Sequence, residues 1–119
     1  MGSIEHFVRG RGAQTSAVYR LFREAILTGR QVTCLYQGRA RALCPHIIGH
    51  TRGAEVVLAW QFGGESSGPL PMWRCLYLDG VSGAQLREGR WHTGEHHRST
   101  QTCVADIDLD INVHVRKAR

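Results

Sequence analysis

Histidine side chains gather in a polar stretch late in the chain, where His92, His96 and His97 lie close together. His46 could join them in space. Imidazole nitrogens bind zinc, and the spacing of His92 and His96 would place both on one face of a helix. Gly94 and its polar neighbours favour a loop instead, and the sequence has no His-Glu-x-x-His motif. We therefore expect exposed loop histidines, and a metal-dependent enzyme is the least favoured function.

Three aspartates, Asp106, Asp108 and Asp110, alternate with apolar residues near the C-terminus. On a β-strand this alternation places the carboxylates on one face and the apolar side chains on the other. The carboxylates could bind a cation or pair with a basic neighbouring strand. A calcium loop would also need a glycine and a distal glutamate, which are missing. We expect an acidic solvent face that protects an edge strand.

Nucleophilic catalysis has weak support in this sequence. Cys44 and His46 would point to the same side of a strand, which is the nearest approach to a Cys/His pair. No glycine-flanked serine and no phosphate-binding glycine loop is present. We therefore expect a protein that is not an enzyme, with no catalytic residue, no metal and no cofactor.

Arginine dominates the charge of the 119-residue chain, whose formal net charge is +5. Residues 1–54 hold eight arginines against two glutamates, a net +6. The planar guanidinium group fits phosphate and carboxylate in a bidentate manner, so nucleic acids, nucleotides and anionic metabolites are plausible partners. A solvated basic surface is the alternative. Residues 1–14, with Arg-Gly-Arg-Gly at 9–12, predict a flexible arm.

The four cysteines, Cys34, Cys44, Cys75 and Cys103, form no CxxC pair. A zinc site built from local knuckles is therefore not expected. Three of them lie in apolar, strand-like runs and predict small buried side chains. We expect reduced thiols and a cytoplasmic location. No apolar run reaches the roughly 18 residues that a membrane span needs, so no membrane partner is expected.

An apolar stripe with helical spacing predicts a helix over residues 16–28. Thr15 or Ser16 can cap its start, and Gly29 suits the position after its end. The stripe consists of Val18, Leu21, Phe22, Ala25 and Ile26. One stripe cannot bury itself, so the helix needs a partner surface.

Short alternating segments separated by glycine-containing turns predict strands from residue 32 onward. The expected strands are residues 32–36, 40–48, 55–62, 72–78 and 103–115, with 81–86 as a short strand or a helical turn. No crossover helices separate them, so the strands should pair antiparallel. We expect a mainly β (α+β) fold in which the N-terminal helix packs on a small SH3/Sm-like β-barrel of five to six antiparallel strands. Residues 15–119 would form this single domain.

Several of these segments resemble a family of bacterial regulators. Tyr36 ends the first strand, residues 41–45 read Arg-Ala-Leu-Cys-Pro, residues 56–58 read Val-Val-Leu, and residues 74–81 read Arg-Cys-Leu-Tyr-Leu-Asp-Gly-Val. Their order and spacing resemble the WYL domain family, which has a tyrosine strand, Arg-x-x-x-Pro, a Trp-Tyr-Leu strand and Arg-x-Phe-Arg-Leu-Asp-Arg-Ile. The resemblance covers roughly residues 18–90. Valines replace the tryptophan and tyrosine that name the family, and the family's helix-turn-helix is not expected before residue 16.

The resemblance implies a ligand-sensing or regulatory module that binds a nucleotide or single-stranded nucleic acid in a basic pocket. Arg41 and Arg74 match two arginines of the family pattern, and both would contact the anion. The alternative is that each pairs with Glu55 or Asp79, or lies exposed. The implied ligand-binding residues are Arg41, Arg74, Tyr77, Trp60 and Tyr36. For Tyr77 and Trp60, packing in the core is the alternative to stacking on a base.

A second hypothesis is a protein-interaction module with no small ligand. The altered Trp-Tyr-Leu strand and the missing DNA-binding region favour it. A small barrel with exposed strand edges could pair edge to edge as a homodimer.

Overall fold

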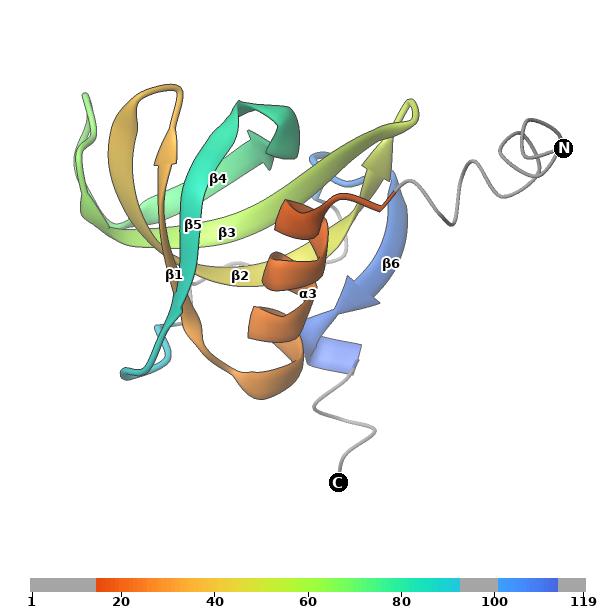
Figure 1. The fold of residues 1–119 in the computed structure, drawn as a ribbon, viewed down its shortest axis with the longest axis horizontal. Helices are drawn as coiled ribbons and strands as arrows, with labels where there is room; N and C mark the ends of the chain where they lie inside the picture. The colour runs from red at the N-terminus through yellow and green to blue at the C-terminus, as the bar shows by residue number, and fades with distance from the viewer. Residues whose placement is uncertain (1–14, 93–100, 114–119) are drawn as a thin grey trace, which may run out of the picture.

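The structure is a computed structural model that describes residues 15–92 and 101–113, and it is mainly β as predicted (Figure 1). The elements are α3 (Ala17–Thr28), β1 (Gln31–Tyr36), β2 (Arg39–Thr51), β3 (Ala54–Gly64), β4 (Met72–Tyr77), the 3-10 turn η1 (Leu78–Gly80), β5 (Val81–Arg87) and β6 (Asp106–Asp110). Helical residues 111–113 follow β6. The expected flexible arm at 1–14 lies outside the described residues.

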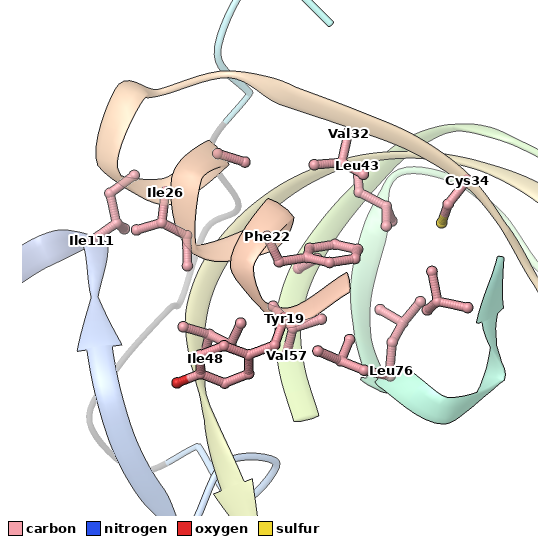
Figure 2. Close-up of a cluster of buried hydrophobic side chains, with 14 residues drawn as sticks. Tyr19, Phe22, Ile26, Val32, Cys34, Leu43, Ile48, Val57, Leu76 and Ile111 are labelled. Carbon is pink, nitrogen blue, oxygen red and sulfur yellow. The ribbon is translucent and has the colours of Figure 1, made fainter. Parts of the chain in front are cut away.

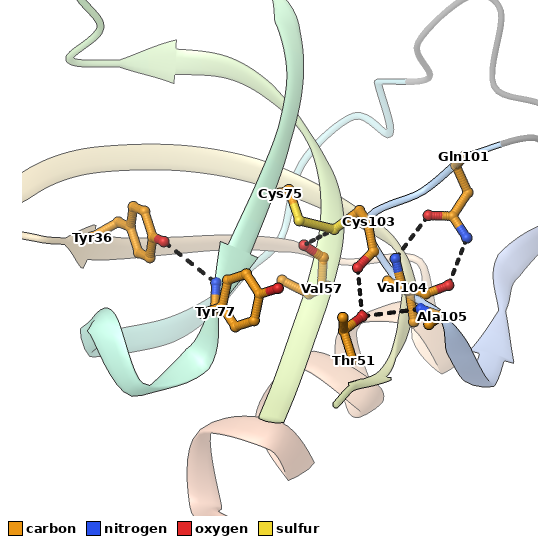
Figure 3. The surroundings of a disulfide bond; sticks show 9 residues. All are labelled: Tyr36, Thr51, Val57, Cys75, Tyr77, Gln101, Cys103, Val104 and Ala105. Atoms are coloured by element: carbon orange, nitrogen blue, oxygen red, sulfur yellow. Dashed lines mark hydrogen bonds between the residues drawn. A yellow bond between two sulfur atoms is a disulfide. The ribbon is translucent and has the colours of Figure 1, made fainter. Parts of the chain in front are cut away.

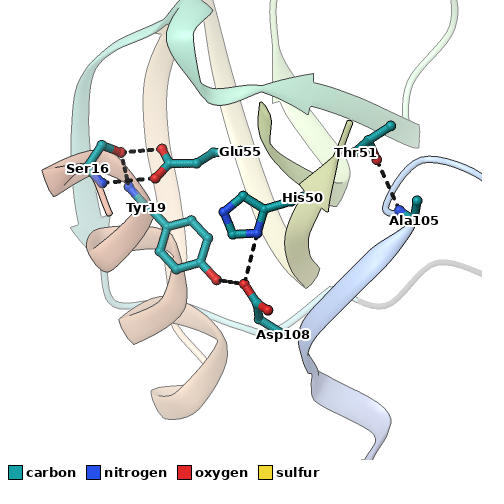
Figure 4. Close-up of polar contacts among 7 residues, drawn as sticks. All are labelled: Ser16, Tyr19, His50, Thr51, Glu55, Ala105 and Asp108. Atoms are coloured by element: carbon teal, nitrogen blue, oxygen red, sulfur yellow. Dashed lines mark hydrogen bonds and ion pairs between the residues drawn. The ribbon is translucent and has the colours of Figure 1, made fainter. Parts of the chain in front are cut away.

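Helix α3 begins and ends where the sequence predicts. The Ser16 hydroxyl caps the helix by accepting a hydrogen bond from the Tyr19 N–H at 3.0 Å, and Gly29 ends it in the left-handed conformation at φ 67°. The Glu55 carboxylate accepts from the Ser16 N–H at 2.9 Å and from the Ser16 hydroxyl at 2.5 Å (Figure 4). These two hydrogen bonds tie the start of α3 to β3. The negative charge of Glu55 is also favourable at this end of a helix.

The sheet is antiparallel with the order β4-β3-β2-β1-β5, and β6 pairs with the second half of β2. Pro45 lies in β2 between the stretches that pair with β1 and with β6, at a bulge against β3. This position needs no ladder N–H, which explains a proline inside a long strand. Among the described residues no ladder joins β4 to β5, so the sheet is open and the predicted barrel is not confirmed.

The two hairpins β1–β2 and β2–β3 turn through residue pairs with positive φ. Gln37 and Gly38 have φ of 51° and 82°, and Arg52 and Gly53 have φ of 52° and 83°. Two consecutive left-handed residues match the right-handed twist of the flanking strands. These tight turns, both predicted, set the registers of the three central strands.

The main core fills the concave face of the sheet, beneath α3 (Figure 2). Its most deeply buried large members are at most 1% exposed: Phe22, Ile26, Val32, Leu43, Ile48, Val57 and Leu76. They come from α3 and from β1 to β4, and the helix itself packs mainly over β2 and β5. Burial of this kind contributes about 1.5–3 kcal/mol per large apolar side chain.

A second cluster lies on the opposite face of β3, where Val56 and Leu58 pack with Ile47 and Val104. Sequence alternation predicts Val56, Leu58, Trp60 and Phe62 on one face, but the main core takes the intervening Val57 and Ala59 instead. Both faces of β3 are therefore covered, which is typical of a near-continuous apolar strand.

A disulfide between Cys75 of β4 and Cys103 ties the segment that leads into β6 onto this second face (Figure 3). The prediction that all four thiols are reduced is thus wrong for Cys75 and Cys103. It is consistent with the structure only for Cys34 and Cys44, which are free and buried. The cytoplasmic expectation depended on those reduced thiols and is not shown.

Of the two alternatives predicted for residues 81–86, the structure has the strand, because β5 (Val81–Arg87) pairs with β1. The last predicted strand differs from the structure. It covers only Asp106–Asp110 of the predicted 103–115, because residues 103–105 do not pair in the sheet and residues 111–113 are helical, while 114 and 115 lie outside the described residues. No helix within the described ranges is long and apolar enough to cross a bilayer.

Candidate functional site

Arg41 and Arg74 meet at one buried amide. Arg41 donates from Nη1 to Oε1 of Gln61 at 2.9 Å, and Arg74 donates from Nε to the same oxygen at 2.8 Å. Arg74 also donates from Nη2 to the Ser66 hydroxyl at 2.5 Å. The two guanidinium groups predicted to share a site therefore do lie together.

The sheet register explains this meeting. Arg41 on β2 pairs with Gly64 of β3, and Arg74 on β4 pairs with Ala59 of the same strand. Arg41 and Arg74 each lie two residues from a core leucine, so both side chains share the concave face with the main core. The three central strands thus place two cations at the polar edge of an apolar concavity.

Gln61 is fully buried and held at both ends. Its Nε2 donates to the carbonyl oxygens of Gly63 and Glu65, each at 2.9 Å. Both amide protons are used, which fixes Oε1 toward the arginines. The side chain therefore links the guanidinium pair to the loop that follows β3.

The electrostatics of the pair are those of two unneutralised cations. Burial lowers the pKa of the Arg41 guanidinium, and the charges of Arg74 and Arg39 lower it further. The Arg41 Nε is buried and has no hydrogen-bond partner in the part of the chain that the structure describes. In the two described ranges neither Arg41 nor Arg74 forms an ion pair. A partly buried cation without a carboxylate is costly, and a bound anion would relieve that cost.

The acidic residues that could have neutralised these arginines lie elsewhere. Glu55 binds Ser16 at the start of α3, and Asp79 lies in η1 with an exposed side chain. Glu65 approaches Gln61 only through its backbone carbonyl, and its side chain is exposed. Within residues 15–92 and 101–113, the site is therefore basic without a compensating carboxylate.

Tyr36 belongs to the same group of residues. The Arg41 guanidinium carbon lies 5.5 Å from the centroid of the Tyr36 ring, a cation–π distance. The Tyr36 hydroxyl accepts from the Tyr77 N–H at 3.4 Å (Figure 3). A Cβ on Gly80 would lie 3.1 Å from this ring, so the turn after β4 closes against it.

Trp60 and Tyr77 do not join the arginines. Trp60 packs edge-on against Trp73 with ring centroids 5.0 Å apart, and Tyr77 packs against the second cluster. Both side chains lie on the face of the sheet opposite to Arg74, because they alternate with residues of the main core. The packing alternative holds for both, and neither is placed to stack on a ligand beside the two arginines.

Sequence reasoning missed Gln61 and Ser66. Alternation places Gln61 opposite the apolar side chains of β3, which predicts a solvent-facing glutamine. The unbroken apolar run from Val56 to Trp60 is the signal that both faces are covered. Ser66 lies in a loop, where nothing local indicates its contact with Arg74.

The histidines and cysteines that the structure describes do not form a reactive site. His46 is buried between Trp73 and Trp91, with ring centroids 4.9 and 5.1 Å away, and its Nδ1 lies 2.8 Å from the Cys44 carbonyl oxygen. His92 stacks on Phe62 at 4.1 Å. Its predicted partners His96 and His97 lie outside the described residues. Within those residues no cluster of metal-binding side chains occurs.

Asp108 makes structural contacts with other elements, so it does not belong to the acidic solvent face that the sequence predicts. Its Oδ2 accepts a hydrogen bond from the Tyr19 hydroxyl and lies 3.2 Å from Nδ1 of His50 (Figure 4). Tyr19 and His50 also stack with centroids 5.6 Å apart. Burial and the bond to Asp108 raise the pKa of Tyr19 well above its usual value. The group ties α3, β2 and β6 together.

A cavity of about 370 Å³ lies at the start of α3, away from the arginines. Its lining includes the apolar Val18, Leu78 and Val81 and the acidic Glu55 and Asp79. Its two carboxylates make this cavity unsuitable for an anion. The cavity is therefore separate from the site of Arg41 and Arg74 that the sequence predicts.

Comparisons with protein-family models, with curated proteins and with solved structures find no match for this chain.

Proposed function

We propose that this chain is a sensing or regulatory module that binds an anionic ligand, a nucleotide or single-stranded nucleic acid, through Arg41 and Arg74. The proposal includes a WYL-like architecture in which η1 closes the curled sheet into a small barrel. One observation carries it: two guanidinium groups share a single amide oxygen and have no carboxylate partner among the described residues.

The chemistry of this arrangement favours an anion. Gln61 Oε1 satisfies one N–H of each arginine but carries no formal charge. The remaining guanidinium N–H groups are donors, and charge-assisted bonds to phosphate or carboxylate are about twice as strong as neutral ones. Because Gln61 is held by two backbone carbonyls, the donors are positioned before a ligand arrives.

Thermal unfolding with and without ligand tests this function. Mononucleotides and short single-stranded oligonucleotides should raise Tm by mass action, equivalent to about 2.7 kcal/mol at a hundredfold excess over Kd. Arg74→Ala should abolish the shift. Arg90→Ala is the matched control, since it removes the same charge from an exposed side chain that makes no contact with Arg41 or Arg74. An unchanged Tm across a broad panel of anions and oligonucleotides would contradict the proposal.

Homodimerisation through β6 is a second candidate. Ile107 on this strand is 49% exposed, and in the described sheet β6 pairs with β2 alone. Two copies could pair along the free edge and cover Ile107. Light scattering at high concentration should then give a dimer mass, and Ile107→Lys should return it to a monomer. A monomer at all concentrations excludes this interface.

A further inference from the structure

We propose that the Arg41–Arg74 site prefers a terminal phosphate, a monoester dianion, over a phosphodiester or a carboxylate. The inference depends on the proposed function and names the chemical class of its ligand.

The site has a high local positive charge. Arg39 lies two residues before Arg41 on β2, and its charge reaches the Arg41 guanidinium together with that of Arg74. No carboxylate is among the groups that perturb Arg41, and Glu65 contributes only its backbone. Arg39 thus adds a third positive charge to the field of the pair, and no carboxylate of the described residues forms an ion pair with Arg41 or Arg74. A monoester phosphate carries about −1.5 to −2 at neutral pH, whereas a phosphodiester or a carboxylate carries only −1.

Side chains of three residues can donate hydrogen bonds to a ligand at this site. The Ser66 oxygen accepts hydrogen bonds from Arg74 Nη2 and from the Gly68 N–H at 3.1 Å, and its own hydroxyl hydrogen has no acceptor in the described residues. The site therefore offers donors from Arg41, Arg74 and Ser66. A terminal phosphate presents three strong acceptor oxygens, while a diester keeps two non-bridging oxygens and a carboxylate has two.

The Gln61 amide oxygen is an acceptor whose position is fixed. Gln61 lies between the two arginines and cannot turn its amide nitrogen toward them without losing both backbone acceptors. The guanidinium groups consequently stay close despite their mutual repulsion. Such pre-positioned like charges favour the ligand with the highest charge density, since it neutralises both groups at once.

Matched ligand pairs test the preference. Titration calorimetry would compare a 5′-phosphorylated oligothymidylate with its 5′-hydroxyl form, and a nucleoside monophosphate with the cyclic diester of the same base. We expect each monoester to bind about tenfold or more tightly, which corresponds to about 1.4 kcal/mol. Inorganic phosphate, as a third probe, reports whether the phosphate alone is recognised. Tight binding by the mononucleotide but not by free phosphate assigns part of the affinity to the base.

Three variants distinguish the loss of a ligand contact from a loss of folding. Ser66→Ala should weaken monoester binding more than diester binding, while Ser67→Ala, at the exposed neighbouring residue, should change neither. Arg39→Gln should reduce the ratio of monoester to diester affinity. Each variant's Tm without ligand checks that it folds.

The outcomes are distinguishable. Equal affinity for monoester and diester, with Arg74 still required, overturns the terminal-phosphate inference and leaves the anion site standing. If none of the probes binds, the proposed function itself is overturned.

Discussion

Burial decides how the individual thiols of this protein behave. Cys34 and Cys44 are both enclosed, and burial raises the pKa of each, to about 11 for Cys34, while nearby Arg41 only partly opposes the shift at Cys34. A thiol with a raised pKa is a poor nucleophile at neutral pH. In addition, His46 turns Nδ1 toward the Cys44 carbonyl rather than its sulfur. The Cys/His pair considered from the sequence is therefore a packing contact.

The buried Cys34 thiol makes stability sensitive to alkaline pH. Its pKa is raised from 9.0 to about 11, so above pH 9 the unfolded chain loses this proton more readily than the folded one. The free energy of unfolding should thus fall as pH rises through this window, with Cys44 contributing in the same direction. Urea denaturation at a series of pH values measures the slope, and Cys34→Ala should reduce it.

Val32→Ala is the control for that experiment. Val32 is buried on the same strand and face as Cys34 but does not titrate. It should lower stability at every pH by creating a cavity, while leaving the slope intact. A Cys34→Ala protein with the wild-type slope would show that this thiol does not titrate as the structure indicates.

At the scale of elements, local signals were predictable and long-range partners were not. The apolar stripe, Ser16 and Gly29 located α3, and glycine-containing turns located both tight hairpins. The pairing of β6 with β2 depends on contacts far apart in sequence, which periodicity does not encode. Likewise, the meeting of Arg41 with Arg74 was expected only from a family resemblance. Gln61, which holds them, required knowing that both faces of β3 are covered.

The approach of β6 to β2 depends on the missing side chain of Gly49. A Cβ there would lie 2.0 Å from the Asp106 carbonyl oxygen and 2.8 Å from a Val104 methyl carbon. Gly49→Ala should therefore displace the start of β6 and cost about 1–3 kcal/mol, the usual range for overpacking. Gly68→Ala is the matched control, because a Cβ at Gly68 meets nothing within 4 Å.

Hydrogen exchange locates the effect of this substitution. The amides of β6 should exchange faster in Gly49→Ala, while those of the β1–β2 hairpin keep their protection. Equal stability of the Gly49 and Gly68 variants would mean that β6 does not approach β2 as closely as described.

At the scale of the whole molecule, the segment of residues 101–105 covers the face of the sheet that α3 leaves open. Val104 is 2% exposed in the second cluster, and the Thr51 hydroxyl donates to the Cys103 carbonyl at 2.7 Å and accepts from the Ala105 N–H at 3.0 Å (Figures 3 and 4). The covalent link from Cys103 to Cys75 fixes this cover to β4. Cysteine spacing alone could not predict the Cys75–Cys103 disulfide. Four cysteines can pair completely in three ways, or they can form no disulfide at all.

The disulfide should therefore stabilise the whole fold. It closes a loop with a sequence separation of 28 residues, for which the chain-entropy model gives about 3–4 kcal/mol. The double variant Cys75→Ser, Cys103→Ser should lose about this much in urea denaturation, and reductant should lower the stability of the wild type but not of the variant. Alkylation of the denatured, non-reduced protein should modify only Cys34 and Cys44. Modification of all four cysteines before reduction would show that the thiols are free, and the second face would then depend on the packing of Val104 and the Thr51 hydrogen bonds alone.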